Sequence, residues 1–364
     1  HALRWAMDSR TRTFLALERQ PADRIPTDFW ASGAMIRRIE AEEGLPYEAF
    51  LDRHDIDLRY IPGPCYVGPP LPEGGDIWGV RRRSVDVPTP YGEERYSEVA
   101  ESPLAGLETP EEIAAYTGWP SADAFDYSVI PDQCRPLREA GRVVCFMGDR
   151  LNRVAQLKPA MYLRGAENIF VDLADRPEMA EAVFGKIREF YLDYLERILR
   201  AAAGKIDIVL TGDDFGAQNG LLVGAGMWRK FIMPGFADYI GLIKSHGAIA
   251  MHHTCGSVSE IIPDMIRCRL DVLQSIQPEA RGMSLAGLKE KFGGSLCFHG
   301  GISIQKTMPF GSEDDVRREV RAIADVVRQD GGYIFCTSHN IQADTPARNI
   351  VALMEAYLLY GNTT

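Results

Sequence analysis

A histidine and a cysteine stand two residues apart in the segment His252-His253-Thr254-Cys255. If this segment continues a β-strand, its side chains alternate between two faces, so His253 and Cys255 share one face while His252 and Thr254 share the other. An imidazole and a thiolate on one face suit Zn²⁺, which prefers nitrogen and sulfur ligands. The spacing therefore indicates a candidate metal site, although both residue types are also common in protein cores.

A third ligand for such a site has to come from elsewhere in the chain. Cys336 and His339 are the available donors, and both follow the last apolar run that has strand character. Cys336 stands directly after that run, which favours a core position for it. On spacing alone, the choice between the two residues stays open.

Other polar residues also follow apolar runs, at points where strands are expected to end. Asp149 follows one run, and Asp213 and Asp214 follow the next. We expect one of this aspartate pair to orient substrate or act as acid or base, and the other to cap a helix or pair with an arginine. Gln218 is expected either to hydrogen-bond a ligand or to shape a turn, and His299 is expected near the same rim.

These residues need a scaffold of alternating strands and helices, and the apolar pattern predicts one. Eight runs have strand character, at residues 25–30, 58–61, 143–146, 206–210, 248–251, 271–273, 296–298 and 333–335. Helical spacing is found at residues 7–24, 47–55, 178–203, 227–245, 257–268, 312–329 and 346–360. Because such alternation produces parallel strands joined by crossovers, we predict an α/β fold with a single (β/α)8 TIM barrel, with an open doubly wound sheet as the alternative.

One long segment, residues 62–125, does not follow this alternation. It is rich in proline and glycine and has no sustained helical or strand period, so we predict an irregular insertion that covers the mouth of the barrel. The rest of residues 7–364 is expected to form the same domain. Residues 1–6, before Met7, are expected to be a remnant of an expression tag.

The composition of the chain argues against several classes of protein. With 40 basic and 51 acidic residues the chain carries a formal charge of −11, which argues against nucleic acid or anionic membranes as partners. Seven cysteines without framework spacing indicate thiols or metal ligands in a reducing compartment. The sequence contains no run of roughly 20 apolar residues, no signal-peptide pattern and no nucleotide-binding glycine motif, so we expect a cytoplasmic protein that does not act on nucleotides.

Several segments together resemble the uroporphyrinogen decarboxylase superfamily, along nearly the whole chain from about residue 10. They are residues 17–26, 212–214, 227–234, 253–256, 300–303 and 338–346. Decarboxylases of this superfamily carry an arginine-bearing signature near the first strand that binds porphyrin carboxylates. The corresponding residues here, 30–34, contain no arginine, so the chain is more similar to the zinc-dependent, corrinoid-linked methyltransferases of the superfamily.

The resemblance implies a ligand set. That methyltransferase branch uses His-x-Cys and a later Cys as zinc ligands, and the first two match His253 and Cys255. Seven residues before Pro346 the chain has His339, where those methyltransferases have Cys and the decarboxylases have His. The resemblance therefore implies Zn²⁺ held by His253, Cys255 and His339, with Cys336 as the substitute third ligand.

The resemblance also implies a function. We expect methyl transfer between a small methylated substrate or a thiol and a corrinoid (cobalamin), as in an O-demethylase acting on a methoxy or methylthio compound. The chain contains no D-x-H-x-x-G corrinoid motif, so the corrinoid is expected on a separate partner protein. The alternatives are a cofactor-free decarboxylase and a non-catalytic barrel that binds a tetrapyrrole or corrinoid. The chain itself is expected to be a monomer or a homodimer.

Overall fold

A computed structural model describes residues 6–148 and 153–362, so the interpretations of residues 1–5 and Asp149 lie outside the described residues. The chain has an α/β fold with a curled parallel sheet of seven strands, ordered β1-β6-β7-β8-β9-β10-β11. These strands are β1 (Leu58–Ile61), β6 (Val143–Phe146), β7 (Ile208–Gly212), β8 (Ile249–His253), β9 (Val272–Ile276), β10 (Cys297–Gly300) and β11 (Tyr333–Ile334).

The predicted eighth strand, residues 25–30, is not a regular strand. It forms one isolated bridge, which pairs Thr27 with Phe335 in parallel. The carbonyl of Thr27 also accepts the Leu58 N–H at 3.3 Å, so the segment lies between β11 and β1. Pro26 has no N–H to donate to a ladder, which explains the interruption. The sheet is thus consistent with a TIM-like barrel in which one strand position is irregular.

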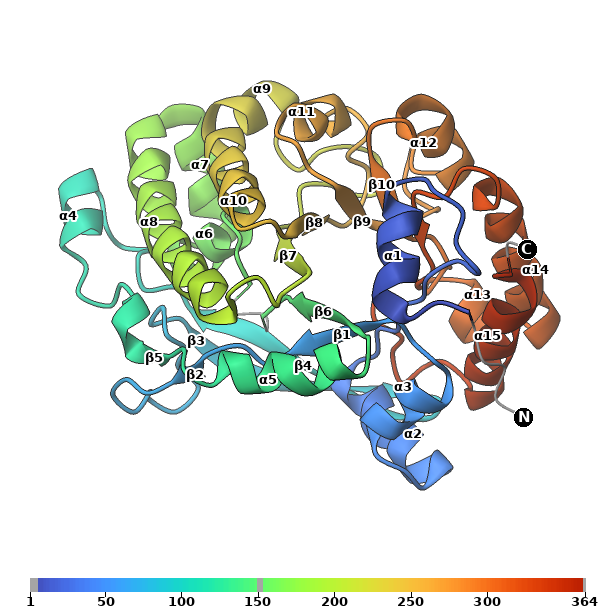
Figure 1. The fold of residues 1–364 in the computed structure, drawn as a ribbon. Coiled ribbons are helices and arrows are strands. Elements are labelled where there is room, and N and C mark those ends of the chain that lie inside the picture. Colours follow the sequence, from blue (N-terminus) through green and yellow to red (C-terminus); the bar gives the residue numbers. More distant parts are fainter. Residues whose placement is uncertain (1–5, 149–152, 363–364) are drawn as a thin grey trace.

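Helices surround this sheet (Figure 1). The longer ones are α1 (Ser9–Leu17), α2 (Gly33–Glu43), α3 (Tyr47–Arg53), α5 (Ile130–Glu139), α6 (Leu157–Arg164), α7 (Ala166–Asp175), α8 (Pro177–Ala202), α10 (Met233–Ser245), α12 (Leu285–Phe292), α14 (Glu313–Val327) and α15 (Ala347–Tyr360). Shorter ones are α4 (Pro110–Ala115), η1 (Ala122–Ala124), α9 (Ala225–Met227), η2 (Trp228–Ile232), α11 (Ile262–Arg267) and α13 (Thr307–Phe310).

Three predicted helices are shorter or less regular than their apolar spacing indicates. The first ends at Leu17 rather than near residue 24, because Arg19 adopts a left-handed φ of 59° that a helix cannot continue. A π-turn over Trp228–Ile232 precedes α10 within the predicted helix 227–245. Only Ile262–Arg267 of the predicted helix 257–268 is helical.

The segment 62–125 contains a regular antiparallel hairpin, so its description as an irregular insertion was wrong. Strands β3 (Arg81–Thr89) and β4 (Gly92–Glu101) pair along their whole length, and β2 (Cys65–Tyr66) pairs with β5 (Phe125–Asp126). Most hairpin side chains are exposed on both faces, so the sequence lacks the apolar alternation of a half-buried strand. Coverage of the barrel mouth by this segment stays a prediction.

The hairpin contacts the barrel through Glu94, which is its one buried residue. The Glu94 Oε2 atom accepts hydrogen bonds from the Ser32 hydroxyl at 2.7 Å and from the Ala343 N–H at 3.1 Å. The Thr89 hydroxyl donates to the Ala343 carbonyl at 3.3 Å. The hairpin therefore joins the start of α2 to the loop that follows β11.

Strand side chains alternate between the barrel interior and the surrounding helices. The interior set includes Val143, Cys145, Ile208, Leu210, Met251, Val272, Cys297 and Ile334. The intervening residues pack against the helices and include Val144, Phe146, Val209, Ala250, Leu273 and Phe298. Carrying this alternation toward the carboxyl ends of the strands places His253 on the interior face, two residues beyond Met251.

Within the described ranges, none of the helices combines the length and the apolar character needed to cross a bilayer. All seven cysteines are free thiols. The absence of disulfides among them agrees with the spacing of the cysteines in the sequence.

Candidate metal centre

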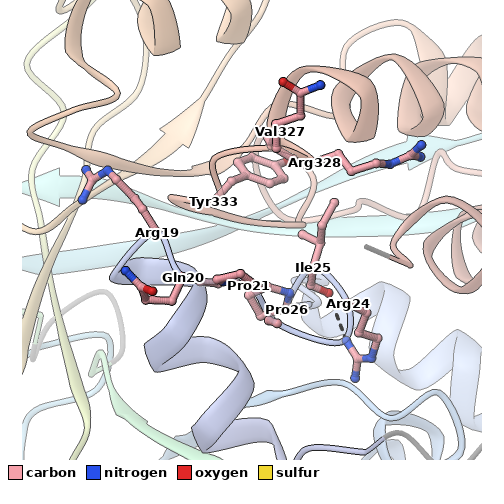
Figure 2. Close-up of a pocket in the computed structure, with 13 residues that line it drawn as sticks. Arg19, Gln20, Pro21, Arg24, Ile25, Pro26, Val327, Arg328 and Tyr333 are labelled. Carbon is pink, nitrogen blue, oxygen red and sulfur yellow. Dashed lines mark hydrogen bonds between the residues drawn. The ribbon is translucent and has the colours of Figure 1, made fainter. Parts of the chain in front are cut away.

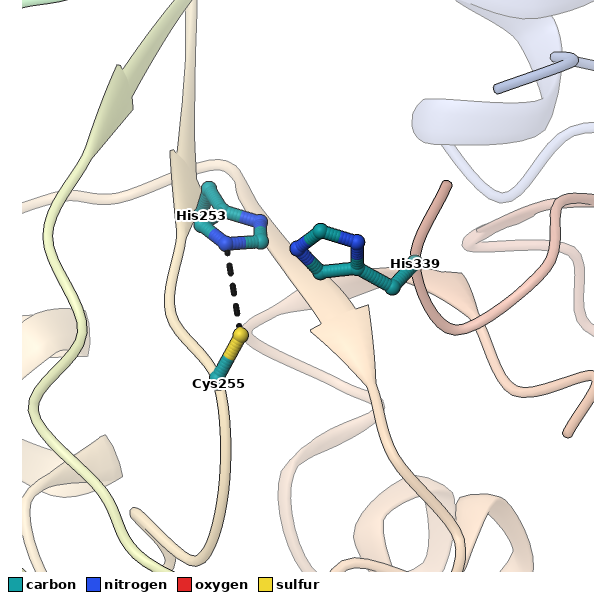
Figure 3. Close-up of side chains that lie close together, drawn as sticks. All are labelled: His253, Cys255 and His339. Carbon is teal, nitrogen blue, oxygen red and sulfur yellow. Dashed lines mark hydrogen bonds between the residues drawn. The ribbon is translucent and has the colours of Figure 1, made fainter. Parts of the chain in front are cut away.

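Three side chains from two distant segments meet at the carboxyl end of the barrel (Figure 3). Ligand atoms of His253, Cys255 and His339 all lie within 4.8 Å of one another. The Sγ atom of Cys255 is 3.5 Å from Nε2 of His253, and the ring centroids of the two histidines are 5.5 Å apart. Two imidazoles and one thiol in this arrangement are a chemically sound set of zinc ligands.

Local backbone geometry brings the first two ligands together. His253 is the last residue of β8, and Cys255 lies in the turn that follows. The turn ends at Gly256, whose φ of 76° favours glycine. A Cβ atom there would also lie 2.5 Å from the backbone of Gly216, so the glycine permits a close crossing of two loops.

A buried glutamine orients the His253 ring. The Nδ1 atom of His253 lies within hydrogen-bond distance of the Gln274 side-chain oxygen, and Gln274 is fully buried on β9. With Nδ1–H donating to this oxygen, the ring directs Nε2 toward Cys255 and toward Oδ1 of Asp214, which is 3.3 Å away. A cation placed between these three atoms would be within reach of all of them.

The electrostatic environment fits a metal ion. Burial, together with the neighbouring His253 and Arg153 side chains, lowers the pKa of His339 to about 3, so its imidazole is neutral and able to donate a lone pair. Burial and the Asp214 carboxylate raise the pKa of the Cys255 thiol above its usual value. A bound metal ion would reverse this effect by stabilising the thiolate.

The two adjacent aspartates have different environments. Asp214 lies beside the candidate ligands, where Oδ1 accepts the Cys255 N–H at 3.1 Å and Oδ2 forms an ion pair with Lys158. Burial alone would raise the pKa of Asp214, but its hydrogen bond with His253 and the charge of Lys158 lower it well below the usual range. Asp214 is therefore ionised next to the ligand set.

Asp213 instead holds the start of α6. Its carboxylate accepts backbone N–H groups from Gln156 and Lys158 at 2.7 Å each and also from Leu157. Burial nevertheless raises the pKa of Asp213 to about 7. The structure thus gives Asp214 the contacts with the ligand set and Asp213 the helix-capping contacts.

His252 faces away from the ligands, as strand alternation predicts. Its ring stacks on Phe215 at 5.1 Å and packs edge-on against Phe236 at 4.9 Å, while Nδ1 is 2.8 Å from the Thr211 hydroxyl. Burial lowers the pKa of His252 to about 3. Its contacts are those of a neutral core histidine.

Three other predicted site residues lie away from this centre. Gln218 is exposed and donates its side-chain N–H to the Glu279 carbonyl, which joins two loops. His299 and Cys336 are fully buried in the barrel interior, where they form a second cluster with Asp28. The structure therefore places His339, rather than Cys336, beside His253 and Cys255.

The interior cluster is held by its own hydrogen bonds. Oδ2 of Asp28 accepts from the Trp30 indole at 3.0 Å, the Tyr60 hydroxyl at 2.6 Å and His299 Nε2 at 2.8 Å. Oδ1 of Asp28 accepts the Phe29 N–H at 2.8 Å. The Trp30 ring centroid lies 6.0 Å from the rings of both His253 and His299, so Trp30 contacts both clusters.

A cavity of about 220 Å³ opens beside the candidate metal ligands. It is lined by Arg153, Ala155, Lys158, Pro159, Tyr162, Gly212, Asp213, His253, His339 and Asn340. Sequence reasoning missed Arg153 and Lys158, because neither follows a predicted strand directly. The available signal was the pair of basic residues in an otherwise apolar stretch, residues 153–163.

A larger cavity, of about 340 Å³, lies where β11 begins, away from the metal ligands (Figure 2). Arg19, Arg24 and Arg328 line it, but their side chains extend in different directions. Arg24 is engaged by Asp55 at 3.0 Å and Asp57 at 2.7 Å. The arginines thus do not converge on one point inside this cavity.

Comparison with known proteins identifies the family. The uroporphyrinogen decarboxylase (URO-D) family matches residues 154–358, which is more than half of the 364-residue chain. The chain belongs to the uroporphyrinogen decarboxylase family. All three candidate ligands of this family member lie inside the matched region, and the β3–β4 hairpin precedes it.

Among solved structures, a methyltransferase from Methanosarcina mazei is similar to this family member, with a TM-score of 0.68 and 16% identity over 97% of this chain and 99% of that one. At this identity the likeness shows a common fold. Native xylanase 10B from Thermotoga maritima has a TM-score of 0.42 and 9% identity, over 69% and 85% of the two chains, which is too weak to support an inference. No curated protein sequence matches the chain.

Proposed function

We propose that this member of the uroporphyrinogen decarboxylase family is a zinc-dependent methyltransferase that moves a methyl group between a small substrate and a corrinoid protein. The observation that carries the proposal is the convergence of His253, Cys255 and His339 within 4.8 Å beside a cavity. The family match and the fold shared with a methyltransferase support the same class of enzyme.

The chain's own residues have distinct roles in this proposal. His253, Cys255 and His339 would hold Zn²⁺, and Gln274 fixes the His253 ring so that Nε2 faces the other ligands. When bound, the zinc would supply Lewis acidity that activates a thiol or a methylated heteroatom. Asp214 would set the charge next to the ligands through its contacts with the Cys255 N–H and Lys158.

The partner in this proposal is a separate corrinoid protein. The sequence contains no D-x-H-x-x-G motif with which the chain could carry the cofactor itself. The cavity beside the ligands would therefore take the small substrate, and the methylated or reduced corrinoid would approach from the open side of the same rim.

Metal analysis followed by a transfer assay tests the proposal. We expect about one zinc per purified chain, and methyl transfer to or from a corrinoid protein that stops when a chelator removes the zinc. A protein that binds no zinc and releases carbon dioxide from a porphyrinogen would instead identify a cofactor-free decarboxylase. A protein that binds a corrinoid without any turnover would identify a non-catalytic barrel.

A further inference from the structure

The three candidate ligands differ in how they are held. Gln274 accepts a hydrogen bond from the His253 ring. Asp214 accepts the backbone N–H of Cys255 at 3.1 Å. The His339 ring packs edge-on against the His253 ring, and among the described residues no side chain or backbone group is hydrogen-bonded to it. The position of the third ligand therefore depends on the backbone of the loop that carries it.

This loop, residues 337–343, is bonded to the barrel on both sides of the third ligand. The Ser338 N–H donates to the Ile302 carbonyl at 2.7 Å, beyond the end of β10. The Ile341 N–H donates to the Trp30 carbonyl at 2.9 Å. These bonds fix the path of the loop up to the residue before its contact with the hairpin.

The β3–β4 hairpin holds the next two residues of the loop. The Glu94 Oε2 atom accepts the Ala343 N–H at 3.1 Å, and the Thr89 hydroxyl donates to the Ala343 carbonyl at 3.3 Å. The Tyr96 hydroxyl donates to Oε1 of Gln342 at 3.1 Å. Three hairpin side chains thus restrain the loop a few residues beyond the third ligand, and they engage both backbone groups of Ala343.

Glu94 makes this attachment rigid, because its side chain is buried. The residue is 5% exposed, and the same Oε2 atom also accepts the hydroxyl of Ser32, the N-cap of α2, at 2.7 Å. A buried carboxylate that loses its donors is costly, so both donors are held at one point. Glu94 therefore fixes the loop relative to a helix of the barrel.

We propose that the β3–β4 hairpin is a strap that sets the position of His339, with Glu94 as the positioning residue. This inference rests on the proposed function, because it concerns the third candidate ligand of the same site. Glu94 does not contact the metal position and acts through the backbone between Ala343 and His339. A metal ion needs all of its ligands at bond distance together, so a loop displaced by about 1 Å would weaken binding without unfolding the barrel.

Zinc affinity measured by competition with a chelator tests the strap. Glu94→Ala is expected to lower the affinity about tenfold, as for other residues that orient a metal ligand. Glu94→Gln should retain most of it, because the amide oxygen can accept the same two donors. Glu98→Ala is the matched control, since Glu98 is exposed on the same strand and pairs with Arg83. An affinity in Glu94→Ala equal to that of the control would overturn the proposal.

A double-mutant cycle shows whether Glu94 acts through His339. In a protein that already carries His339→Ala, Glu94→Ala should change zinc affinity by less than about twofold, because the ligand that the strap positions is absent. In a protein that carries Gln274→Ala, the tenfold effect of Glu94→Ala should persist. A full tenfold loss in the His339→Ala background would show a general loss of structure and contradict the proposal.

NMR of the metal-free protein separates this inference from the proposed function. The ring signal of His339 is assigned by its absence in His339→Ala. We expect this signal to shift or broaden in Glu94→Ala and in Tyr96→Phe, which removes only one hydroxyl, while the signal of the core residue His252 stays in place. Lack of zinc binding would overturn the proposed function alone. An unmoved His339 signal in both variants, or equal movement of both signals, would overturn the strap.

Discussion

Two clusters in this protein offer similar ligand atoms but differ in how those atoms are satisfied. His253 and His339 line a cavity, and Nε2 of His253 lies near the Asp214 carboxylate and the Cys255 thiol. The cluster of Asp28, His299 and Cys336 is sealed in the barrel interior. Hydrogen bonds from Trp30, Tyr60 and His299 already satisfy its carboxylate.

This difference shows that ligand types alone do not define a metal site. A buried carboxylate whose oxygens already accept hydrogen bonds needs no cation, whereas ligand atoms that face one another beside a cavity can bind one. We therefore expect zinc at the first cluster and a purely structural role for the second. Four measurements test this contrast, in order of decreasing effect.

Substituting the thiol of each cluster should give opposite results. Cys255→Ala is expected to lower zinc affinity by more than about 100-fold, because it removes a direct ligand. Cys336→Ala should leave about one zinc per chain. Elemental analysis and competition with a chelator measure both variants. Loss of zinc in Cys336→Ala with retention in Cys255→Ala would assign the metal to the interior cluster.

Removing the residue that orients His253 should have an intermediate effect. Gln274→Ala is expected to weaken zinc binding about 10- to 100-fold, because the His253 ring would lose the partner of Nδ1. The same chelator competition gives the affinity. Gln218→Ala is the matched control, since Gln218 is exposed and bonds to a loop carbonyl. An unchanged zinc affinity in Gln274→Ala would contradict the proposed role of Gln274 in orienting His253.

Zinc affinity should rise with pH by about tenfold per unit from the contribution of Cys255. The pKa of this thiol is raised above its usual value, so it is protonated near neutral pH and releases one proton when the metal binds. His339 adds no proton release above about pH 4, because its pKa is about 3. Affinities measured between pH 6 and 8 give the slope, and a slope of zero would exclude a thiolate ligand.

Asp28→Asn should leave zinc binding unchanged within about twofold while lowering the free energy of unfolding by about 1–3 kcal/mol. The new amide N–H₂ group would face the Trp30 and Tyr60 donors in place of an oxygen that accepts from them, so buried hydrogen bonds would be lost. Denaturant unfolding and zinc titration measure the two effects. A large loss of zinc with unaltered stability would contradict the structural role of the interior cluster.

Alternating apolar runs predicted most of the fold, because strands such as β6 and β7 are buried on both faces and flanked by long amphipathic helices. The hairpin β3–β4 was not predicted because its strands are exposed and so lack an apolar pattern. Cross-strand ion pairs such as Arg83–Glu98 stabilise it instead. The short helix α6 was missed for another reason: Asp213, far along the chain, caps its start.

The candidate site was predicted in part. Strand alternation predicted that His253 and Cys255 share one face and that His252 lies on the other, because this arrangement follows from local backbone geometry. The choice between His339 and Cys336, and the separate environments of Asp213 and Asp214, depend on contacts between segments that are distant in sequence. Arg153 and Lys158 likewise join the site only through tertiary structure.

The attachment of Glu94 to Ala343 bears on when the centre becomes complete. During synthesis the hairpin leaves the ribosome long before residues 339–343. The hydrogen bond from the Ala343 N–H to Glu94 can therefore form only after that loop has been made. Contacts between such distant residues form slowly, because the intervening chain must first be ordered. The third ligand, His339, therefore reaches its partners near the end of folding, and metal uptake is expected to follow completion of the polypeptide.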